Sequence, residues 1–153
     1  MTDTSNSAAA ERGSASPSDR PYAQTLQALR DKGLRPTRQR LALGRLLFDG
    51  GDRHVTAEAL HGEAARAGVK VSLATVYNTL HQFTDAGLLR QGVVDGGCTY
   101  FDTNLEDHHH FYHVGDARLE DIPGHGISVT GLPDVPEGTA LERVEVIVRV
   151  DKA

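Results

Sequence analysis

Apolar side chains recur at helical spacing through the first half of the chain and predict four helices. The first is expected over 21–32, and the second begins after Thr37, a favourable N-cap. Thr56 and Ser72 are suitable caps for the third and fourth helices, and the fourth is expected over 73–86. The inward positions predicted for these last two helices are Leu60, Ala64, Ala67, Leu73, Val76, Leu80 and Phe83.

Two runs with strand character follow the fourth helix. They cover 88–94 and 99–102 and flank the hairpin turn sequence Asp-Gly-Gly-Cys at 95–98. Three helices followed by a two-stranded hairpin are typical of a winged helix-turn-helix domain. In such a domain the last helix enters the major groove of DNA and the wing touches the backbone.

The outer face of the fourth helix is polar and mostly uncharged. Its hydroxyl and amide groups can hydrogen-bond to base edges. An ordinary solvated surface face remains the alternative, because helical spacing alone does not distinguish the two. The side chains expected on this face are Thr75, Asn78, Thr79 and Gln82.

The second half of the chain predicts a small β-rich unit. Short strands are expected over 108–114 and 119–122, followed by a Gly/Pro-rich stretch and a last strand over 141–150. A small open sheet that ends in a long β-branched strand needs further burial to be stable. We therefore expect two copies to pair as a homodimer, which would read a pseudo-palindromic DNA site.

The expected fold class is α+β with three parts. Residues 1–19 are polar and predicted to be a disordered tail. Residues 20–102 form an N-terminal winged helix-turn-helix domain, and residues 103–153 form a small C-terminal α/β or mostly-β dimerisation and regulatory domain.

The net charge of −5 conceals an asymmetry between the two halves. Residues 20–92 carry eleven Lys/Arg and six Asp/Glu, whereas residues 93–153 carry four Lys/Arg and twelve Asp/Glu. A basic module beside an acidic one indicates that the first meets a polyanion, although a scatter of solvated charge is the alternative. The side chains expected to neutralise phosphate are Arg35, Arg38, Arg40 and Arg90.

Composition argues against a membrane protein and against sites that need several cysteines. The chain has no apolar run of transmembrane length and no signal-peptide pattern, so we expect a cytoplasmic protein without membrane association. Cys98 is the only cysteine, which excludes an intrachain disulfide and a four-cysteine zinc site.

The most concentrated chemistry lies between Asp102 and His113, where four of the eight histidines occupy the last six positions. Histidine and carboxylate bind borderline divalent metals, and histidine also ligates haem iron. A polar loop or an edge strand with chance histidines is the alternative. A metalloenzyme is a further alternative, but it leaves the basic half without a role.

Three motifs resemble the ferric uptake regulator (Fur) family: Gly-Leu-Arg-Pro-Thr-Arg-Gln-Arg at 33–40, His-Val-Thr-Ala-Glu-Ala-Leu at 54–60 and Ser-Leu-Ala-Thr-Val-Tyr-Asn-Thr-Leu at 72–80. The resemblance covers about 20–150. It implies a dimeric regulator on operator DNA, with Tyr77 on thymine methyls and Arg35 in the minor groove. Asn78 stands where many members have Arg, which suggests a different operator. The DNA contacts expected in full are Arg35, Arg38, Arg40, Ser72, Thr75, Tyr77 and Asn78.

The resemblance also implies a regulatory metal site between the two domains, in which Fe, Mn or Zn acts as a co-repressor. A ligand set drawn from both halves would fix their relative angle. The matching positions are His54, Asp102, His108, His110 and Asp121.

Departures from the family point to one branch of it. The chain lacks the two Cys-x-x-Cys pairs of most members. The three consecutive histidines at 108–110, Asp-Ile-Pro at 121–123, Leu-Pro at 132–133, Pro-Glu-Gly at 136–138 and the ending Val-Glu-Val-Ile-Val-Arg-Val at 144–150 resemble the iron response regulator (Irr) branch of alphaproteobacteria. That branch implies a repressor of iron and haem metabolism genes that loses DNA binding when haem ligates the run at His108, His109 and His110. If the run is a strand, His109 points away from its neighbours and is free for haem. Cys98 is followed by Thr99 rather than Pro, so it is expected to be a bystander.

Overall fold

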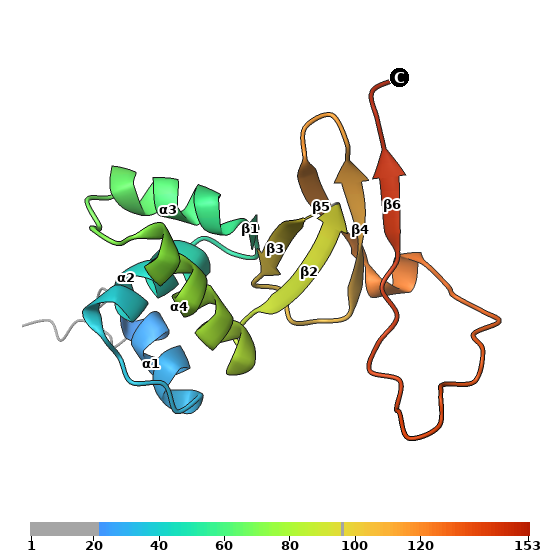
Figure 1. The fold of residues 1–153 in the computed structure, drawn as a ribbon, viewed down its shortest axis with the longest axis horizontal. Coiled ribbons are helices and arrows are strands. Elements are labelled where there is room, and N and C mark those ends of the chain that lie inside the picture. The colour runs from blue at the N-terminus through green and yellow to red at the C-terminus, as the bar shows by residue number, and fades with distance from the viewer. Residues whose placement is uncertain (1–21, 96) are drawn as a thin grey trace, which may run out of the picture.

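A helical cluster, a first sheet and a second sheet follow one another along the long axis of the molecule (Figure 1). The computed structural model describes residues 22–95 and 97–153. The polar tail predicted over 1–19 lies outside these residues. Among the described residues, no helix has the length and apolar character needed to cross a membrane.

The four predicted helices are present, as α1 (Ala23–Asp31), α2 (Arg38–Phe48), α3 (Ala57–Arg66) and α4 (Leu73–Asp85). The side-chain oxygen of Thr37 accepts a hydrogen bond from the Arg40 amide at the start of α2. Thr56 and Ser72 cap α3 and α4 in the same way. These caps satisfy amides that otherwise have no partner within a helix, which explains where each helix begins.

The helices enclose one apolar core, and most of the predicted inward positions belong to it. Three positions differ from the prediction. Ala67 is exposed because it is the C-cap of α3, and Leu73 is 36% exposed at the first position of α4. Thr79, expected on the outer face, is buried, and its hydroxyl is satisfied by the carbonyl of Thr75 at 2.8 Å. The central core residues are Leu29, Leu43, Leu47, Leu60, Val76, Leu80, Phe83 and Phe101.

The first sheet has the antiparallel order β1-β3-β2. The hairpin strands β2 (Arg90–Asp95) and β3 (Cys98–Asp102) were predicted, whereas β1 (His54–Val55) was not. A two-residue strand is too short to show alternation in the sequence. It matters nonetheless, because β1 pairs His54 directly opposite Asp102.

The second sheet has the order β5-β4-β6. Strands β4 (His108–His113) and β5 (Arg118–Pro123) form an antiparallel hairpin, and β6 (Ile147–Val150) pairs in parallel with β4. A short 3-10 helix, η2 (Gly124–Gly126), and a long loop connect β5 to β6 (Figure 1).

Strand β6 is shorter than the predicted 141–150. The amide of Val146 donates to Nδ1 of His109 rather than to a strand carbonyl, so the regular pairing begins only at Ile147.

A second apolar cluster joins the two sheets. Tyr100 of the wing packs with Tyr112 and Leu119 of the second sheet, and its hydroxyl donates to the carbonyl of Ala117 at 2.9 Å. Arg149 of β6 stacks on the Tyr112 ring and donates to the carbonyl of Val94. One face of the wing is therefore part of the domain junction.

Candidate metal centre and nucleic-acid interface

Strand pairing brings five potential ligands from four strands to one point. His54 and Asp102 are cross-strand partners in the first sheet, and His110 and Asp121 are partners in the second. His108 lies two residues before His110, so both side chains leave β4 on the same side. All five residues expected from the sequence lie together.

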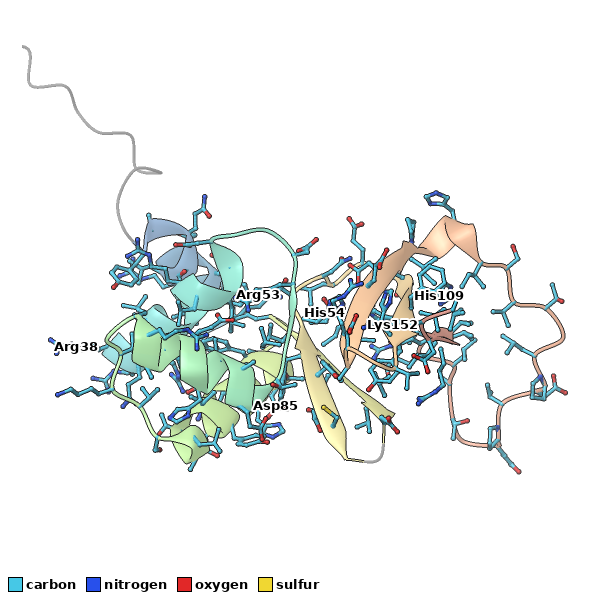
Figure 2. The ribbon with its side chains drawn as sticks, turned by 90° about the horizontal axis from the view of Figure 1, so that it is seen from above. Arg38, Arg53, His54, Asp85, His109 and Lys152 are labelled. Atoms are coloured by element: carbon cyan, nitrogen blue, oxygen red, sulfur yellow. The ribbon has the colours of Figure 1, made fainter. Side chains whose placement is uncertain are left out.

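The five donor atoms lie within 4.8 Å of one another. Oδ2 of Asp102 lies 2.8 Å from Nε2 of His108, 3.1 Å from Nε2 of His54 and 3.3 Å from Nε2 of His110. Oδ1 of Asp121 lies 2.8 Å from Nε2 of His54. Figure 2 shows His54 at the junction between the helical cluster and the second sheet.

Contacts outside the cluster hold the backbone beside His54 and the ring of His108. Arg53, next to His54, forms a bidentate ion pair with Glu63 of α3. Its amide donates to the Thr103 hydroxyl, and its carbonyl accepts from the Thr103 amide. Nδ1 of His108 faces the carbonyl oxygen of Glu106. These contacts come from both domains and fix the strand that carries His54 and the ring of His108.

The third ring, His110, has a carboxylate behind it. Its Nδ1 lies 2.9 Å from Oε1 of Glu145. The two atoms are within hydrogen-bonding distance but are not aligned for a hydrogen bond.

The close contacts within the cluster shift the pKa values of its members. Burial alone would raise the pKa of Asp102, but hydrogen bonds with His110 and the Asn104 amide, together with the close His54 ring, hold that pKa far below its ordinary value. Burial likewise lowers the pKa of His110, yet Asp102 and Glu145 overcome it and raise the pKa to about 9. Paired with His110, Glu145 has a lowered pKa. In this arrangement a proton on His110 balances part of the carboxylate charge.

The donor set fits a divalent cation. Nε2 of His54 and Oδ1 of Asp121 are buried without an aligned hydrogen-bond partner, and their lone pairs converge on a shared point. Three imidazole nitrogens with two carboxylate oxygens suit Fe, Mn or Zn. In the described part of the chain this is the one such cluster of histidine, cysteine and carboxylate residues.

His109 does not belong to the metal cluster, as its opposite orientation in the strand predicted. It is not free, however. The residue is 8% exposed, and Nδ1 of its ring accepts a hydrogen bond from the Val146 amide at 3.0 Å. The neutral ring therefore carries its proton on Nε2.

The side chains expected to meet DNA lie on α2, α4 and the turns before them. Arg38 points away from the rest of the molecule at the end remote from His109 (Figure 2). Arg35, Arg38, Ser72 and Asn78 are exposed, and Thr75 and Tyr77 are half-buried. A shallow hollow between the start of α2 and α4 is lined by Arg35, Thr37, Gln39, Arg40, Thr75, Asn78, Thr79 and Gln82.

Several of these side chains are already engaged within the chain. The Arg40 guanidinium donates to Oε1 of Gln82 and to the carbonyl of Arg35, which ties α2 to α4. The Ser72 hydroxyl is used as the α4 cap. Arg90, expected to meet phosphate, lies at the domain junction, where it donates to Asp107 and to the carbonyl of Glu106.

Three side-chain contacts at the two sites were not expected from the sequence. Glu58 of α3 accepts a hydrogen bond from the Tyr77 hydroxyl at 2.6 Å, which lowers the pKa of Glu58 and raises that of Tyr77. Gln82 anchors Arg40, and Glu145 contacts His110. No motif or spacing links these pairs in the sequence, because each depends on how separate elements pack.

Together these features define a class of protein: a winged-helix domain joined to a small sheet domain, with a His/carboxylate cluster that fits a divalent metal at the junction. The ferric uptake regulator family matches residues 31–130, and the chain belongs to this family.

Curated relatives are similar over part of their length. The ferric uptake regulation protein of Vibrio parahaemolyticus is 37% identical over 83 residues, which are 54% of this chain and 56% of that protein. The protein of the same name from Legionella pneumophila is 35% identical over 97 residues, 63% of this chain and 71% of that protein. The match thus spans little more than half the length of the Vibrio relative.

Solved structures match over a greater share. The Vibrio cholerae ferric uptake regulator has a TM-score of 0.65 at 26% identity, covering 82% of this chain and 98% of that one. The regulator from Pseudomonas aeruginosa, solved with manganese, has a TM-score of 0.63 at 25% identity, covering 84% and 97%. These likenesses agree with the α+β fold.

Proposed function

We propose that this protein is a dimeric transcriptional regulator of the cytoplasm, mainly a repressor, whose DNA binding depends on a divalent ion (Fe, Mn or Zn). One observation carries the proposal. Five side chains from both domains converge on one point in a member of this family. The proposed ligands are His54, Asp102, His108, His110 and Asp121.

The position of the site suggests how it controls DNA binding. A bound ion would supply one positive centre that all five donor atoms share. His54 and Asp102 belong to the sheet that follows the helical cluster, whereas the other three belong to the second sheet. Shared ligation holds the two sheets at one angle, and in a dimer that angle sets the separation of the two α4 helices.

Homodimerisation is supported by the open edges of the second sheet. In the described chain β5 and β6 have neighbours on one side only. Pairing with a second copy would cover such an edge. Sedimentation equilibrium should give twice the chain mass, and a monomer at concentrations that bind DNA would contradict the proposal.

DNA binding can be tested without knowledge of the target genes. The manganese-loaded protein should select a pseudo-palindromic duplex from a random library, with an affinity that falls as salt rises. Removal of Mn²⁺ should weaken binding to that duplex.

The matched variants are His54→Ala and His125→Ala. His125 is exposed and lies outside the cluster. His54→Ala should abolish the response of DNA binding to Mn²⁺, and His125→Ala should retain it. Equal responses in the two variants would exclude the proposed site.

A second proposal follows the resemblance to the Irr branch. Haem would be the effector that releases a repressor from operators of iron and haem metabolism genes, through His108, His109 and His110. Support comes from His109, which lies next to the metal ligands without being one of them. Ligation through Nε2 requires the proton on Nδ1, which would break the hydrogen bond from Val146.

Haem titration separates the roles of the three histidines. His109→Ala should remove the Soret shift, whereas His54→Ala should keep it. Haem should also displace the wild-type protein from its selected duplex. A Soret shift unchanged in a variant lacking all three histidines would contradict the haem proposal and leave the metal-dependent one in place.

A further inference from the structure

The two residues before β6 make three contacts with the histidine run of β4. Glu145 places Oε1 2.9 Å from Nδ1 of His110. The carbonyl of Val146 accepts from the His110 amide at 3.1 Å, and the amide of Val146 donates to the His109 ring at 3.0 Å. The C-terminal strand is thus attached to the metal cluster through one short segment.

We propose that Glu145 is a positioning residue for the metal centre: it holds the His110 ring with Nε2 toward the other ligands and links that ring to strand β6. The inference rests on the proposed function only in taking the five-residue cluster as a divalent metal site.

The chemistry of imidazole supports this role. A neutral ring that binds metal through Nε2 keeps its proton on Nδ1, and a carboxylate beside Nδ1 favours that tautomer and strengthens the ligand. Glu145 is suitably placed, with its side chain 30% exposed and Arg143 3.8 Å from its other oxygen. His108 faces a backbone carbonyl at the equivalent position, so among the contacts described for these two rings Glu145 is the outer carboxylate.

The same contact joins metal binding to the docking of β6. Glu145 is separated from Ile147 by one residue, and regular pairing with β4 begins where Ile147 lies opposite His110. An ion that fixes the His110 ring therefore also fixes the start of β6. Loss of Glu145 would weaken binding of the ion, and metal binding would then no longer stabilise the pairing of β6 with β4.

Cobalt(II) is a suitable probe, since its visible spectrum reports the ligands and competition with a chromophoric chelator gives its affinity. In the full chain, Glu145→Ala and Glu145→Leu should each raise the Kd for Co²⁺ about 10–100-fold. Glu145→Gln retains an oxygen acceptor and should lose less affinity. Equal losses in the Gln and Ala variants would overturn the positioning role, because they would reflect charge alone.

Glu142→Ala is the matched control. Its side chain is 89% exposed and contacts Arg143. It should bind Co²⁺ with wild-type affinity and spectrum, whereas the saturated Glu145→Ala protein should show altered Co²⁺ bands. Wild-type affinity in Glu145→Ala or in Glu145→Leu would overturn the proposal. Alanine leaves a space at this position and leucine fills it, so a loss shared by both variants does not come from a folding defect in one of them.

Hydrogen exchange measures the link to β6. Saturating Co²⁺ should slow exchange over residues 144–153 in the wild type and in Glu142→Ala, but not in Glu145→Ala. Equal slowing in Glu145→Ala would contradict the link. Failure of the proposed function has a different signature: DNA binding would be indifferent to metal while the Glu145 variants still showed weaker Co²⁺ binding.

Discussion

The donor atoms of two carboxylates and three imidazoles lie within 4.8 Å of one another. The stability of this cluster therefore depends on which of its residues are protonated. Without a metal ion, a proton on His110 is favoured by Asp102 and Glu145. With an ion bound through Nε2, the same ring must be neutral. Metal and proton therefore compete for one nitrogen.

This competition predicts opposite pH responses with and without metal. The pKa of His110 is raised from 6.5 to about 9, so its contribution to stability is complete below pH 6.5 and is lost as the pH rises through 9. The lowered pKa of Asp102 contributes stability above its ordinary value of 3.8, which is lost only as the pH falls. In chelator, the melting temperature should fall between pH 6.5 and 9.

Zinc should reverse this trend, because deprotonation of His110 favours metal binding. Thermal melts in chelator and in saturating Zn²⁺ over the same pH range provide the check. A melting temperature in chelator that is flat across this range would refute the assigned role of His110.

Ser72 gives a prediction for the start of α4. Its Oγ accepts from the Thr75 amide at 3.1 Å. Ser72→Ala should lower the free energy of unfolding by about 1 kcal/mol, and Ser72→Asn should restore it, since asparagine also caps helices. Urea denaturation measures both. If the two variants are equally destabilised, the cap is not what Ser72 contributes.

At the level of elements, the packing of α1 on α2 depends on one glycine. A Cβ added at Gly44 would lie 2.5 Å from Cγ2 of Thr25, which is fully buried. Overpacking of this kind costs about 1–3 kcal/mol, against a gain in helix propensity of about 1 kcal/mol. Gly44→Ala should therefore destabilise the protein in urea denaturation.

Gly62 is the natural control for Gly44. In α3, a Cβ there would meet only the mobile end of Arg66 at 3.4 Å. Gly62→Ala should stabilise the protein by up to about 1 kcal/mol. Thr25→Ser should rescue Gly44→Ala by removing the clashing methyl group. Failure of that rescue would show that the clash is not the cause.

Some of these elements could be predicted from the sequence and others could not. Caps and helical periodicity predict α1 to α4, because those signals lie within a few residues of each other. Strand β1 cannot be predicted from the sequence, since two residues carry no periodicity and the partner of His54, Asp102, lies far along the chain. The shortened β6 depends on the bond between Val146 and the His109 ring, which no local pattern encodes.

The candidate site likewise has residues that the sequence predicted and contacts that it did not. The five ligands were expected from the resemblance, and the cluster agrees with that expectation. The contacts of Glu145, Gln82 and Glu58 with their partners were not expected, because each forms only through tertiary packing. The expectation that His109 is free was wrong for the same reason.

At the scale of the whole molecule, the two domains meet through more than the metal ligands. The apolar cluster around Tyr100 and Tyr112 joins the wing to the second sheet. Arg90 and Arg149 add polar contacts across the same junction. The proposed metal site thus lies in an interface that is already packed, between the second sheet and the helical cluster that contains α4 (Figure 1).

The central claim is that metal at this junction and DNA at α4 are coupled. Thermodynamic linkage requires the coupling to act in both directions. The direct test is the Kd of the full chain for Mn²⁺, measured alone and with saturating operator duplex. We predict tighter Mn²⁺ binding on DNA, by the same factor as Mn²⁺ tightens DNA binding. Equal Mn²⁺ affinities with and without DNA would contradict the account.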